Sequence, residues 1–377
     1  EPRQNGKTGG ILLPIALLAA IRRPDQLVVW SAHRYKTSHE AFLSVLKLYR
    51  SSPALAARIS KVSFSNGEEA FEFHNGSRII FVARSQASGR GLSGDVVILA
   101  PGTHAGPCAL SSGGQPGAPK ILRGADPNDT AVIAYAGNSS NVIDVLASDI
   151  ELHDLAFGPS NADIDAIKIK DGSRIRVESC SFTAIGGISI SANSKDSDRV
   201  QIVGNTFKAL QATGIYLGCH DGMGSCAATD VLVEGNLFDG VDSPAVGYAL
   251  EIKLDSWGAV RDNVIHDTKG PAIEIYGSTD LARQNLVEGN LVIGSRNAGT
   301  LEIAGGPTIV RNNIVVGGAV AGLYVYDYQS RGLVRAIQVV GNTVVGDAGP
   351  AILLSKWAAG MDLELTDNAA WQQAGAG

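Results

Sequence analysis

Short runs of alternating apolar and variable residues, separated by Gly, Asn, Asp and Ser, fill the chain from about residue 96 onward. Apolar residues at every second position predict β-strands with one buried face. The preceding segment is different, because it combines strand patterns with most of the helical patterns of the chain. We therefore expect two parts, which comprise residues 1–95 and residues 96–377.

The strands of the second part repeat along the chain. One type of strand ends on an Asn, and this position is occupied by Asn205, Asn236, Asn263, Asn290, Asn313, Asn342 and Asn368. Asp154 and Cys180 are expected to hold the same position in earlier repeats. The mean spacing is (368 − 154)/8, about 27 residues. A repeat of this length without an intervening helix predicts a parallel solenoid, in which each repeat forms one coil and neighbouring coils stack about 4.8 Å apart.

The repeated Asn predicts how successive coils are joined. Gly and Asn tolerate the left-handed αL conformation that a sharp corner requires, so we expect them to make these corners. Stacked Asn amides can also hydrogen-bond to one another along the solenoid. We expect Cys180, in the same position, to be an inward-facing thiol of the core.

Residues 94–377 resemble the right-handed parallel β-helix proteins of the pectate-lyase-like superfamily. The segment Gly94-Asp-Val-Val-Ile-Leu-Ala-Pro-Gly-Thr-His-Ala-Gly106 is similar to the one that opens the helix in that group, with His104 in place of the usual Tyr. The resemblance implies a mainly β fold, a right-handed parallel β-helix of about 9–10 coils. It does not select a function, since this fold serves lyases, hydrolases, epimerases, adhesins and phage tailspikes.

A second type of strand places two columns of side chains on an outer face, which we expect to be exposed. The first column consists of Asp144, Lys168, Ser189, Tyr216, Glu251, Glu274, Glu302, Tyr324 and Leu353. The second column consists of Lys170, Ser191, Gly218, Lys253, Tyr276, Ala304, Tyr326 and Ser355.

The candidate catalytic residues are three glutamates on consecutive coils, Glu251, Glu274 and Glu302, together with Lys253. Carboxylates stacked about 4.8 Å apart repel one another, so one pKa should rise or a cation should bind. Neighbouring carboxylates suit a retaining glycosidase, and alternate ones lie at the outer limit for an inverting glycosidase. Alternatively, Lys253 could act as the base for β-elimination from a uronic acid whose carboxylate is neutralised by Glu-bound Ca²⁺.

The candidate substrate-binding residues beside these acids are Tyr216, Tyr276, Tyr324, Tyr326 and Asp327. Flat rings next to carboxylates suit sugars, because a ring can cover the apolar face of a sugar. This predicts a polysaccharide or surface glycan as the partner. The alternative is a solvated face of Glu–Lys pairs and Tyr ladders, which fits a non-catalytic surface or tailspike-like adhesin.

The beginning of the chain contains a candidate nucleotide-binding loop. In the segment Arg3-Gln-Asn-Gly-Lys7-Thr8, backbone amides and Gly6, Lys7 and Thr8 would bind phosphates and Mg²⁺. Strand patterns follow at Leu27-Val-Val-Trp30 and Asn75–Arg84, and then Ser88-Gly-Arg-Gly-Leu-Ser-Gly-Asp95. This order resembles the ATPase domain of phage terminase large subunits, the DNA-packaging motors, which implies ATP and Mg²⁺ as ligands.

The acids that the terminase resemblance requires are missing. In that family the next strand ends in an Asp-Glu pair that supports Mg²⁺ and the attacking water, whereas Val96-Val-Ile-Leu99 continues into Ala100-Pro101. We therefore expect an incomplete α/β P-loop ATPase segment without ATP hydrolysis. Because residues 94–99 fit both families, the chain is interpreted as a chimera. A DNA-packaging ATPase is the remaining alternative.

Composition and charge limit the possible partners and the location of the protein. The chain has 45 Gly in 377 residues and a net charge of −6, so the β-helix part is not expected to bind nucleic acid. The longest apolar run, Ile11–Ile21, is too short to span a bilayer. No signal peptide is evident, and the β-helix part is expected to be extracellular or at the cell surface. Cys219 and Cys226 could form a loop disulfide in an exported protein, bind zinc with His220, or remain free thiols.

Overall fold

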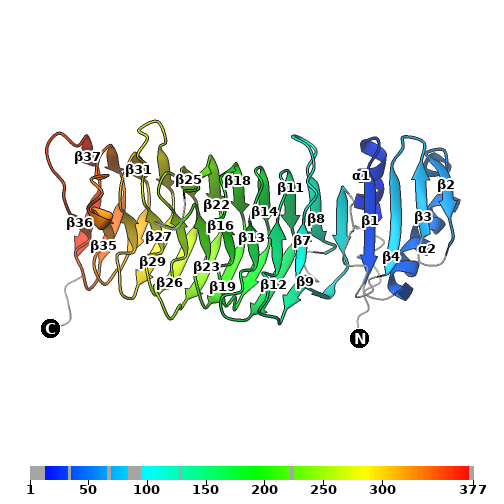
Figure 1. Cartoon of the computed structure of the whole chain (residues 1–377), viewed down its shortest axis with the longest axis horizontal. Coiled ribbons are helices and arrows are strands. Elements are labelled where there is room, and N and C mark those ends of the chain that lie inside the picture. Colours follow the sequence, from blue (N-terminus) through cyan, green and yellow to red (C-terminus); the bar gives the residue numbers. More distant parts are fainter. Residues whose placement is uncertain are drawn as a thin grey trace.

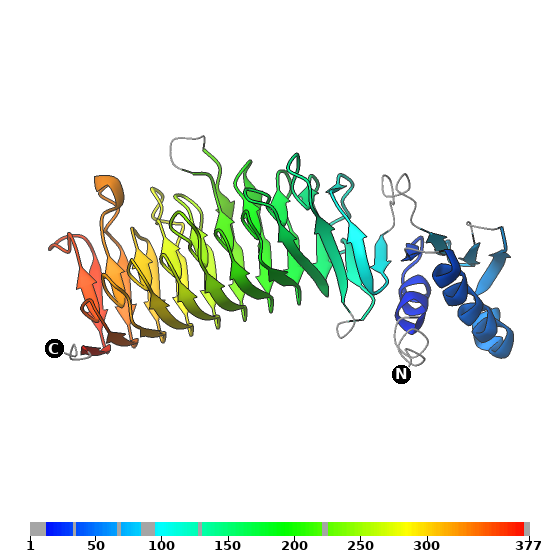
Figure 2. The ribbon, with the colours of Figure 1, turned by 90° about the horizontal axis from the view of Figure 1, so that it is seen from below.

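The protein is an elongated β-solenoid with its α-helices at the N-terminal end (Figures 1 and 2). The computed structural model describes residues 13–32, 35–65, 69–83, 95–126, 130–220 and 225–372. The helices are α1 (Leu13–Arg22), α2 (Tyr35–Ser51) and α3 (Pro53–Ala56), and a 3-10 turn, η2, spans Tyr328–Ser330. No helix within the described residues is long and apolar enough to cross a membrane.

Three long sheets form the solenoid, and the first of them, sheet A, extends into the N-terminal segment. In spatial order, its fifteen strands are β2 (Ile59–Ser63), β3 (Glu69–Phe73), β4 (Arg78–Ala83), β1 (Leu27–Ala32), β5 (Val96–Leu99), β8 (Lys120–Gly124), β11 (Ile150–His153), β14 (Ile175–Glu178), β18 (Val200–Val203), β22 (Val231–Glu234), β25 (Gly258–Arg261), β28 (Asn285–Glu288), β31 (Thr308–Arg311), β34 (Ile337–Val340) and β37 (Leu363–Thr366).

Sheets B and C complete each coil. Sheet B contains β6 (Gly102–Ala105), β9 (Ala131–Tyr135), β12 (Leu155–Ser160), β15 (Ser181–Thr183), β19 (Thr206–Leu210), β23 (Leu237–Val241), β26 (Val264–Thr268), β29 (Leu291–Ser295), β32 (Ile314–Val316), β35 (Thr343–Gly346) and β38 (Ala369–Gln372). Sheet C contains β7 (Cys108–Leu110), β10 (Ile143–Val145), β13 (Ile167–Ile169), β16 (Ile190–Ala192), β20 (Ile215–Leu217), β24 (Leu250–Ile252), β27 (Ile273–Ile275), β30 (Leu301–Ile303), β33 (Leu323–Val325) and β36 (Ile352–Leu354). A short pair, β17 (Ser197–Asp198) and β21 (Ala228–Thr229), lies outside these sheets. The predicted parallel solenoid of about ten coils is therefore confirmed.

The interior of the solenoid is one continuous apolar core in which identical positions stack from coil to coil. The aromatic column Phe157, Phe182, Phe207 and Phe238 shows this most directly, with successive ring centroids 4.3 to 4.9 Å apart and ring planes within 9° of parallel. Ile265 and Val292 continue the column on the next coils. Cys180 is buried in this core as expected, and burial raises the pKa of its thiol to about 12.

The predicted Asn ladder is present between sheets A and B. At each step, the backbone N–H and the side-chain Nδ2 of one Asn donate to Oδ1 of the Asn on the next coil, at 2.9 to 3.0 Å. The ladder comprises Asn205, Asn236, Asn263, Asn290, Asn313, Asn342 and Asn368. Each Nδ2 also donates to a backbone carbonyl of an earlier coil, such as Val260 O for Asn290. The amides thus replace water at a buried corner where backbone groups would otherwise lack partners.

Gly and Asn make αL corners as expected, joined by Asp262 and Asp367, but one residue assigned to the ladder is misplaced. The αL residue is the one before each ladder position, such as Gly204, Gly289 or Asn312, and not the ladder Asn itself. The reason is that the Asn side chain must point inward, so its predecessor makes the turn. Asp154 also has a φ of +54°, and Leu155 aligns with Cys180 through the pairing of β12 with β15. Asp154 therefore lies one residue before the ladder position, and Arg123 donates to its carboxylate at 2.7 Å.

The N-terminal segment caps one end of the solenoid. Its predicted strands are β1 and β4, which pair in parallel, and β1 also pairs in parallel with β5 of the first coil. The four residues of β5 alternate between two cores: Val96 and Ile98 pack with α1 and α2, whereas Val97 and Leu99 pack with the solenoid interior. The stretch that fitted both sequence families is thus a strand that both parts share.

The predicted nucleotide-binding residues Gly6, Lys7 and Thr8 lie outside the described residues. The structure shows an α/β arrangement for residues 13–83, but it shows no P-loop ATPase segment within the described part of the chain. Nucleotide binding, the chimeric origin and the division at residue 95 therefore remain predictions.

We expect Asn290→Ala to lower the free energy of unfolding by about 3 kcal/mol or more, because the buried Asn263 N–H loses its acceptor and the Val260 carbonyl loses a donor, each costing about 1–3 kcal/mol. Urea unfolding measures this loss. The matched control is Asn297→Ala, since Asn297 is exposed. Equal stability of the two variants would show that the ladder contributes nothing.

Candidate active site

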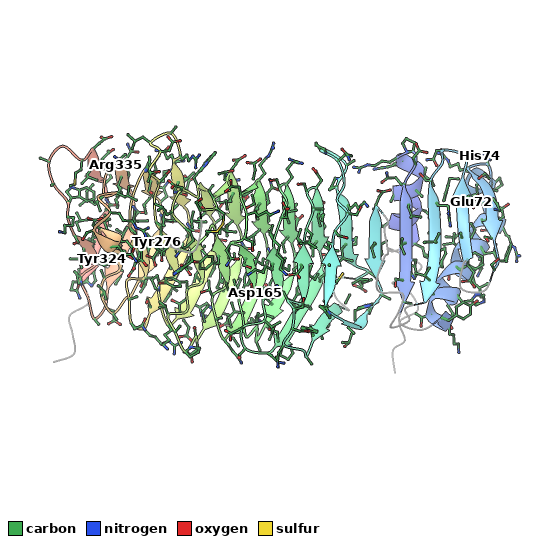
Figure 3. All side chains as sticks on the ribbon, viewed as in Figure 1. Glu72, His74, Asp165, Tyr276, Tyr324 and Arg335 are labelled. Atoms are coloured by element: carbon green, nitrogen blue, oxygen red, sulfur yellow. A yellow bond between two sulfur atoms is a disulfide. The ribbon has the colours of Figure 1, made fainter. Side chains whose placement is uncertain are left out.

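Three glutamates form a column on the outer face of sheet C. Glu251, Glu274 and Glu302 are the central residues of the neighbouring strands β24, β27 and β30, and the strand pairing places them directly opposite one another. Tyr216 precedes them in the same register on β20, and Tyr324 follows them on β33. Figure 3 shows Tyr276 and Tyr324 near the C-terminal end of the solenoid. The predicted column is therefore correct for these five side chains. The prediction that the column is exposed is wrong.

The acid column is buried, contrary to the predicted exposed face. Glu251, Glu274 and Glu302 are only 2%, 1% and 7% exposed. The segment 326–336, between β33 and β34, folds back toward Glu274 and Glu302, and its turn η2 is drawn in orange in Figure 2. Tyr326 donates a short hydrogen bond to Glu274, and the ring of Tyr328 packs edge-on against Tyr276 at 5.0 Å. A solvated face of ion pairs is therefore excluded at these coils.

Glu251 forms a buried ion pair with Lys253. The Lys253 Nζ lies 3.0 Å from Glu251 Oε2, and it also lies over the ring of Tyr276, 3.7 Å from the centroid. The hydroxyl of Tyr276 donates to Glu251 Oε2 at 3.4 Å. Burial raises the pKa of Glu251 above its usual range, although Lys253 and Tyr276 oppose this shift. Lys253 is thus engaged by one acid and two rings, since Tyr216 lies 5.0 Å from its Nζ.

The other two acids lack a basic partner within hydrogen-bonding distance among the described contacts. Burial raises the pKa of Glu274 to about 8, with a further contribution from the charges of Glu302 and Glu251. Burial likewise raises the pKa of Glu302 to about 7, against the Gly299 N–H that donates to its Oε1 at 2.6 Å. Each of the two neighbouring carboxyls therefore gains or loses its proton near neutral pH, so that one can be neutral while the other is charged.

Tyrosines surround the acids on several sides. Burial raises the pKa values of Tyr276 and Tyr326, and the neighbouring glutamate charges add to this effect, so both hydroxyls remain protonated donors. Tyr324 stacks on Tyr326 with ring centroids 4.8 Å apart. The Tyr216 hydroxyl lies 3.1 Å from Nδ1 of His220. All four predicted tyrosines are therefore gathered at the acid column.

The structure places two residues differently from the sequence-based prediction of the site. Asp327 does not join the acids, because its Oδ1 accepts a hydrogen bond from the Gly332 N–H within the turn. In the first column, the register of β16 places Ser191, and not Ser189, beside Lys168 and Tyr216. The polypeptide before β16 contains the Gly186-Gly187 pair, and the strand begins three residues after it.

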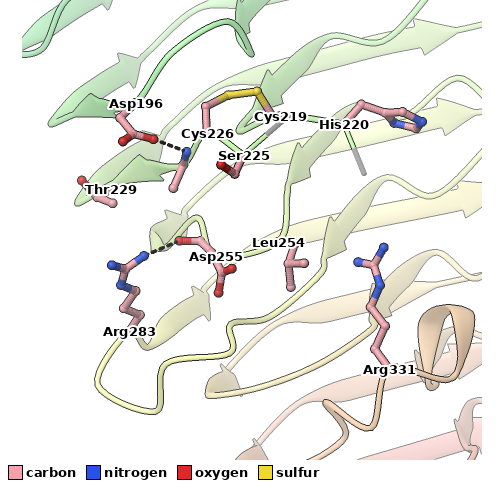
Figure 4. Close-up of a pocket in the computed structure, with 11 residues that line it drawn as sticks. Asp196, Cys219, His220, Ser225, Cys226, Thr229, Leu254, Asp255, Arg283 and Arg331 are labelled. Atoms are coloured by element: carbon pink, nitrogen blue, oxygen red, sulfur yellow. Dashed lines mark hydrogen bonds between the residues drawn. A yellow bond between two sulfur atoms is a disulfide. The ribbon is translucent and has the colours of Figure 1, made fainter. Parts of the chain in front are cut away.

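Two cavities lie at the two ends of strands β20 and β24. One, of about 550 Å³, includes His220, Leu254 and Asp255, which follow strands β20 and β24 (Figure 4). The other, of about 380 Å³, includes Thr213 and Tyr248, which precede the same strands. Because these strands contain only three residues, the column lies between open spaces at both strand ends. This arrangement fits an extended ligand lying across sheet C.

The loop after β20 contains a disulfide. Cys219 and Cys226 are bonded to each other (Figure 4), which confirms the first of the three predicted alternatives. Their sulfurs are consequently not available as zinc ligands or free thiols in this structure. Disulfides persist mainly in exported proteins.

The sequence places Tyr248 and Tyr328 on turns beside the candidate acids without giving them a role, and it does not single out Arg331. Tyr248 forms a side-chain hydrogen bond with Tyr276, and burial together with the charges of Glu274 and Glu251 raises the pKa of Tyr248. Tyr328 and Arg331 lie in the segment that covers the column. The signal for Tyr328 was the aromatic run Tyr324-Val-Tyr-Asp-Tyr328, which continues past the end of strand β33.

A comparison with protein families finds one match for just over half of the chain. Residues 161–351 match the family described as periplasmic copper-binding protein (NosD). A comparison with curated proteins finds no match. The matched region includes the Asn ladder from Asn205 to Asn342 and all three glutamates.

Similar solved structures include polysaccharide-acting β-helix proteins. An alginate lyase from a Paenibacillus species is 17% identical, with a TM-score of 0.51, covering 76% of this chain and 96% of that one. A pectate lyase is 12% identical, with a TM-score of 0.45, covering 77% and 74%. An A-module of a mannuronan C-5 epimerase from Azotobacter vinelandii is 13% identical, with a TM-score of 0.36, covering 76% and 92%. The first of these supports the right-handed parallel β-helix fold.

We expect the stability of the protein to fall as the pH rises from about 4.5 to about 8. Glu274 has a folded-state pKa of about 8 against an ordinary value of 4.5, so it holds a proton that unfolding releases in this range. Glu302 acts in the same direction. Glu274→Gln cannot release this proton, and it should flatten the slope by up to about 1.4 kcal/mol per pH unit.

Urea unfolding of the wild type and Glu274→Gln at several pH values measures this slope. Glu364→Gln, which changes an exposed glutamate on sheet A, is the matched control and should retain the wild-type slope. Identical slopes for the wild type and Glu274→Gln would contradict the assignment of a raised pKa.

Proposed function

This chain belongs to the family described as periplasmic copper-binding protein (NosD), and we propose that it binds a polysaccharide across sheet C and hydrolyses it with the paired carboxyls of Glu274 and Glu302. The observation that carries this proposal is the burial of two adjacent carboxyls that titrate near neutral pH. The polysaccharide lyases, epimerase and glucanase among similar structures share the β-helix fold. Fold alone does not define a substrate, so the proposal depends on the site.

The proposed chemistry assigns different roles to the two carboxyls. Glu274, with a pKa of about 8, is mostly protonated at neutral pH and can donate its proton to the glycosidic oxygen as the sugar bond breaks, whereas Glu302, with a pKa of about 7, ionises more readily. The ionised Glu302 then attacks the anomeric carbon, and water subsequently releases the sugar. Neighbouring strands place these residues about 4.8 Å apart, close to the spacing of retaining glycosidases. Tyr326 holds Glu274 through its hydroxyl.

The segment 326–336 must move for a substrate to reach these acids. Tyr326 and Tyr328 contact Glu274 and Tyr276 from two coils away. Replacing these contacts with a sugar would keep the carboxyls away from water. In this proposal, Glu251 and Lys253 form the charged pair beside the reacting acids, and Tyr216 and Tyr324 flank the bound sugar chain.

The described residues do not fit copper. Copper sites in proteins are typically made of imidazole, thiolate and thioether groups. In the part of the chain that the structure describes, no group of three or more His, Cys, Asp or Glu side chains could hold a metal ion. Cys219 and Cys226 are joined in a disulfide, and Cys180 is buried in the core. We therefore assign no copper-dependent step to this chain.

An exported location accompanies the proposed function. The matched family is described as periplasmic, and the Cys219–Cys226 disulfide is typical of proteins outside the reducing cytosol. We therefore propose that the β-helix acts outside the cytosol, where polysaccharides are found.

We expect the wild type to release new reducing ends from a polysaccharide, and Glu274→Gln and Glu302→Gln each to lower this rate at least about 100-fold, since each removes one partner of the acid–base pair. Chromatography and mass spectrometry of the products measure both effects. Glu364→Gln is the matched control and should retain wild-type activity.

The products also separate the alternatives. Unsaturated sugar ends would replace hydrolysis with β-elimination, and sensitivity to a calcium chelator would then test the predicted Ca²⁺. Binding without products would indicate an adhesin. If Glu251→Gln, Glu274→Gln and Glu302→Gln all left activity unchanged, the acid column would not be the active site.

A further inference from the structure

The outer face of sheet B carries an apolar stripe. The large apolar side chains that it exposes include Leu237, Val264, Ile293, Ile314 and Trp371, which are between 36% and 68% exposed. Monomeric proteins rarely leave a large contiguous apolar surface uncovered, so a stripe of this kind indicates an interaction surface.

Strand pairing aligns the side chains of the apolar stripe in two columns. The first column consists of Leu237, Val264, Leu291 and Ile314 on successive coils, and the second consists of Ile293, Val316, Val345 and Trp371. The stripe therefore runs over six neighbouring strands, from β23 to β38, and its side chains are spaced about 4.8 Å apart.

The outer face of sheet A differs from the stripe on the same coils. One of its columns alternates in charge, with Glu234, Arg261, Glu288 and Arg311 at successive positions. Arg261 pairs with Glu234 at 3.2 Å, and Arg311 pairs with Glu288 at 2.7 Å. Sheet A is therefore a solvated face of ion pairs, and the apolar stripe is a property of sheet B and not of the coil repeat.

We propose that a second copy of the chain covers the apolar stripe, so that two solenoids lie side by side, and not end to end, in a reversible two-fold dimer. β-Sheets pack face to face about 10 Å apart with interdigitated side chains, and a second copy presents columns with the same spacing. This inference does not depend on the proposed function, because the acid column lies on sheet C.

A two-fold axis along the strands, between β29 and β32, brings the most apolar part of the stripe to the centre of the interface. Leu291, which neighbours Ile314 within one copy, then lies opposite Ile314 of the second copy. Asp239 and His266, whose side chains lie 3.6 Å apart, are displaced toward the margin. This arrangement has the apolar centre and the polar rim that are typical of protein interfaces.

The size of the stripe sets the strength of the dimer. Five steps of about 4.8 Å between strands of roughly 17 Å give a footprint of about 400 Å² on each copy, and about 800 Å² for two copies. The accessible surface is larger than this footprint, because the side chains project from the sheet. Stable interfaces bury about 1,200–2,000 Å², and weak, reversible ones bury less. The dimer is therefore expected to form only at high protein concentration.

Sedimentation equilibrium of the full chain, from about 1 µM to about 1 mM, measures this association. We expect a Kd on the order of 0.1 mM for the wild type. The double variant Ile293→Lys/Ile314→Lys should raise it at least about tenfold, because it places unpaired charges at the apolar centre. Leu281→Lys is the matched control, since Leu281 is 59% exposed but lies outside sheet B. Thermal unfolding verifies that each variant is folded.

Salt distinguishes apolar burial from attraction between charges. Raising the NaCl concentration should leave the association unchanged or strengthen it, because salt screens charges but does not weaken the burial of apolar surface. Association that falls with salt would show that charges drive it, and the inference would be wrong.

Three further outcomes would also overturn the dimer. One is a wild type that stays monomeric over the whole concentration range, and another is a double variant that associates as strongly as the wild type. The third is a monomeric wild type that sediments with phosphatidylcholine vesicles through the stripe, which would assign this surface to a lipid bilayer instead.

Discussion

The parallel pairing of each strand with the strands one coil before and one coil after it governs the whole solenoid. It places every outward or inward side chain next to the equivalent residue of the neighbouring coil, about 4.8 Å away. A residue that interacts favourably with its own kind then forms a ladder, as the Asn amides and Phe rings do. Charged residues of the same sign repel one another when they are stacked in this way. In the column of Glu251, Glu274 and Glu302, the positive charge of Lys253 and the protonation of Glu274 and Glu302 reduce this repulsion.

This regularity also explains how much the sequence could predict. The coil repeat, the Asn ladder, the inward Cys180 and the register of the three glutamates follow from short-range periodicity, and the structure confirms them. The burial of the glutamates does not follow from it. Tyr326 contacts Glu274, which lies 52 residues earlier in the sequence. It begins the connection between β33 and β34, which is longer than the equivalent connection between β30 and β31. Periodicity predicts where a strand residue points, but it does not predict which loop will cover it.

The sequence left the exact position of the αL residue at each corner open for a related reason. Both Gly and Asn recur at the corners, and propensity alone does not distinguish the residue that turns from the one whose side chain enters the interior. At Asn312-Asn313 the same residue type fills both roles, the first with φ of +56° and the second within the ladder. Asp154 likewise makes the turn, one residue before the ladder position, and Ser191 takes the column position that a strict repeat assigns to Ser189. Tertiary hydrogen bonding resolves each of these ambiguities.

Strand β5 gives the N-terminal segment a role in keeping the molecule separate from its own copies. One side of β5 pairs with β8, and the other side would be an open parallel edge if β1 were absent. Such an edge has the spacing and direction of another coil, so it is a template for the final coil of a second solenoid. With β1 in place, sheet A instead ends in the antiparallel strands β3 and β2. The segment therefore covers the open edge of the first coil with strands that do not continue the coil repeat, although the outermost strand, β2, again runs parallel to the solenoid strands.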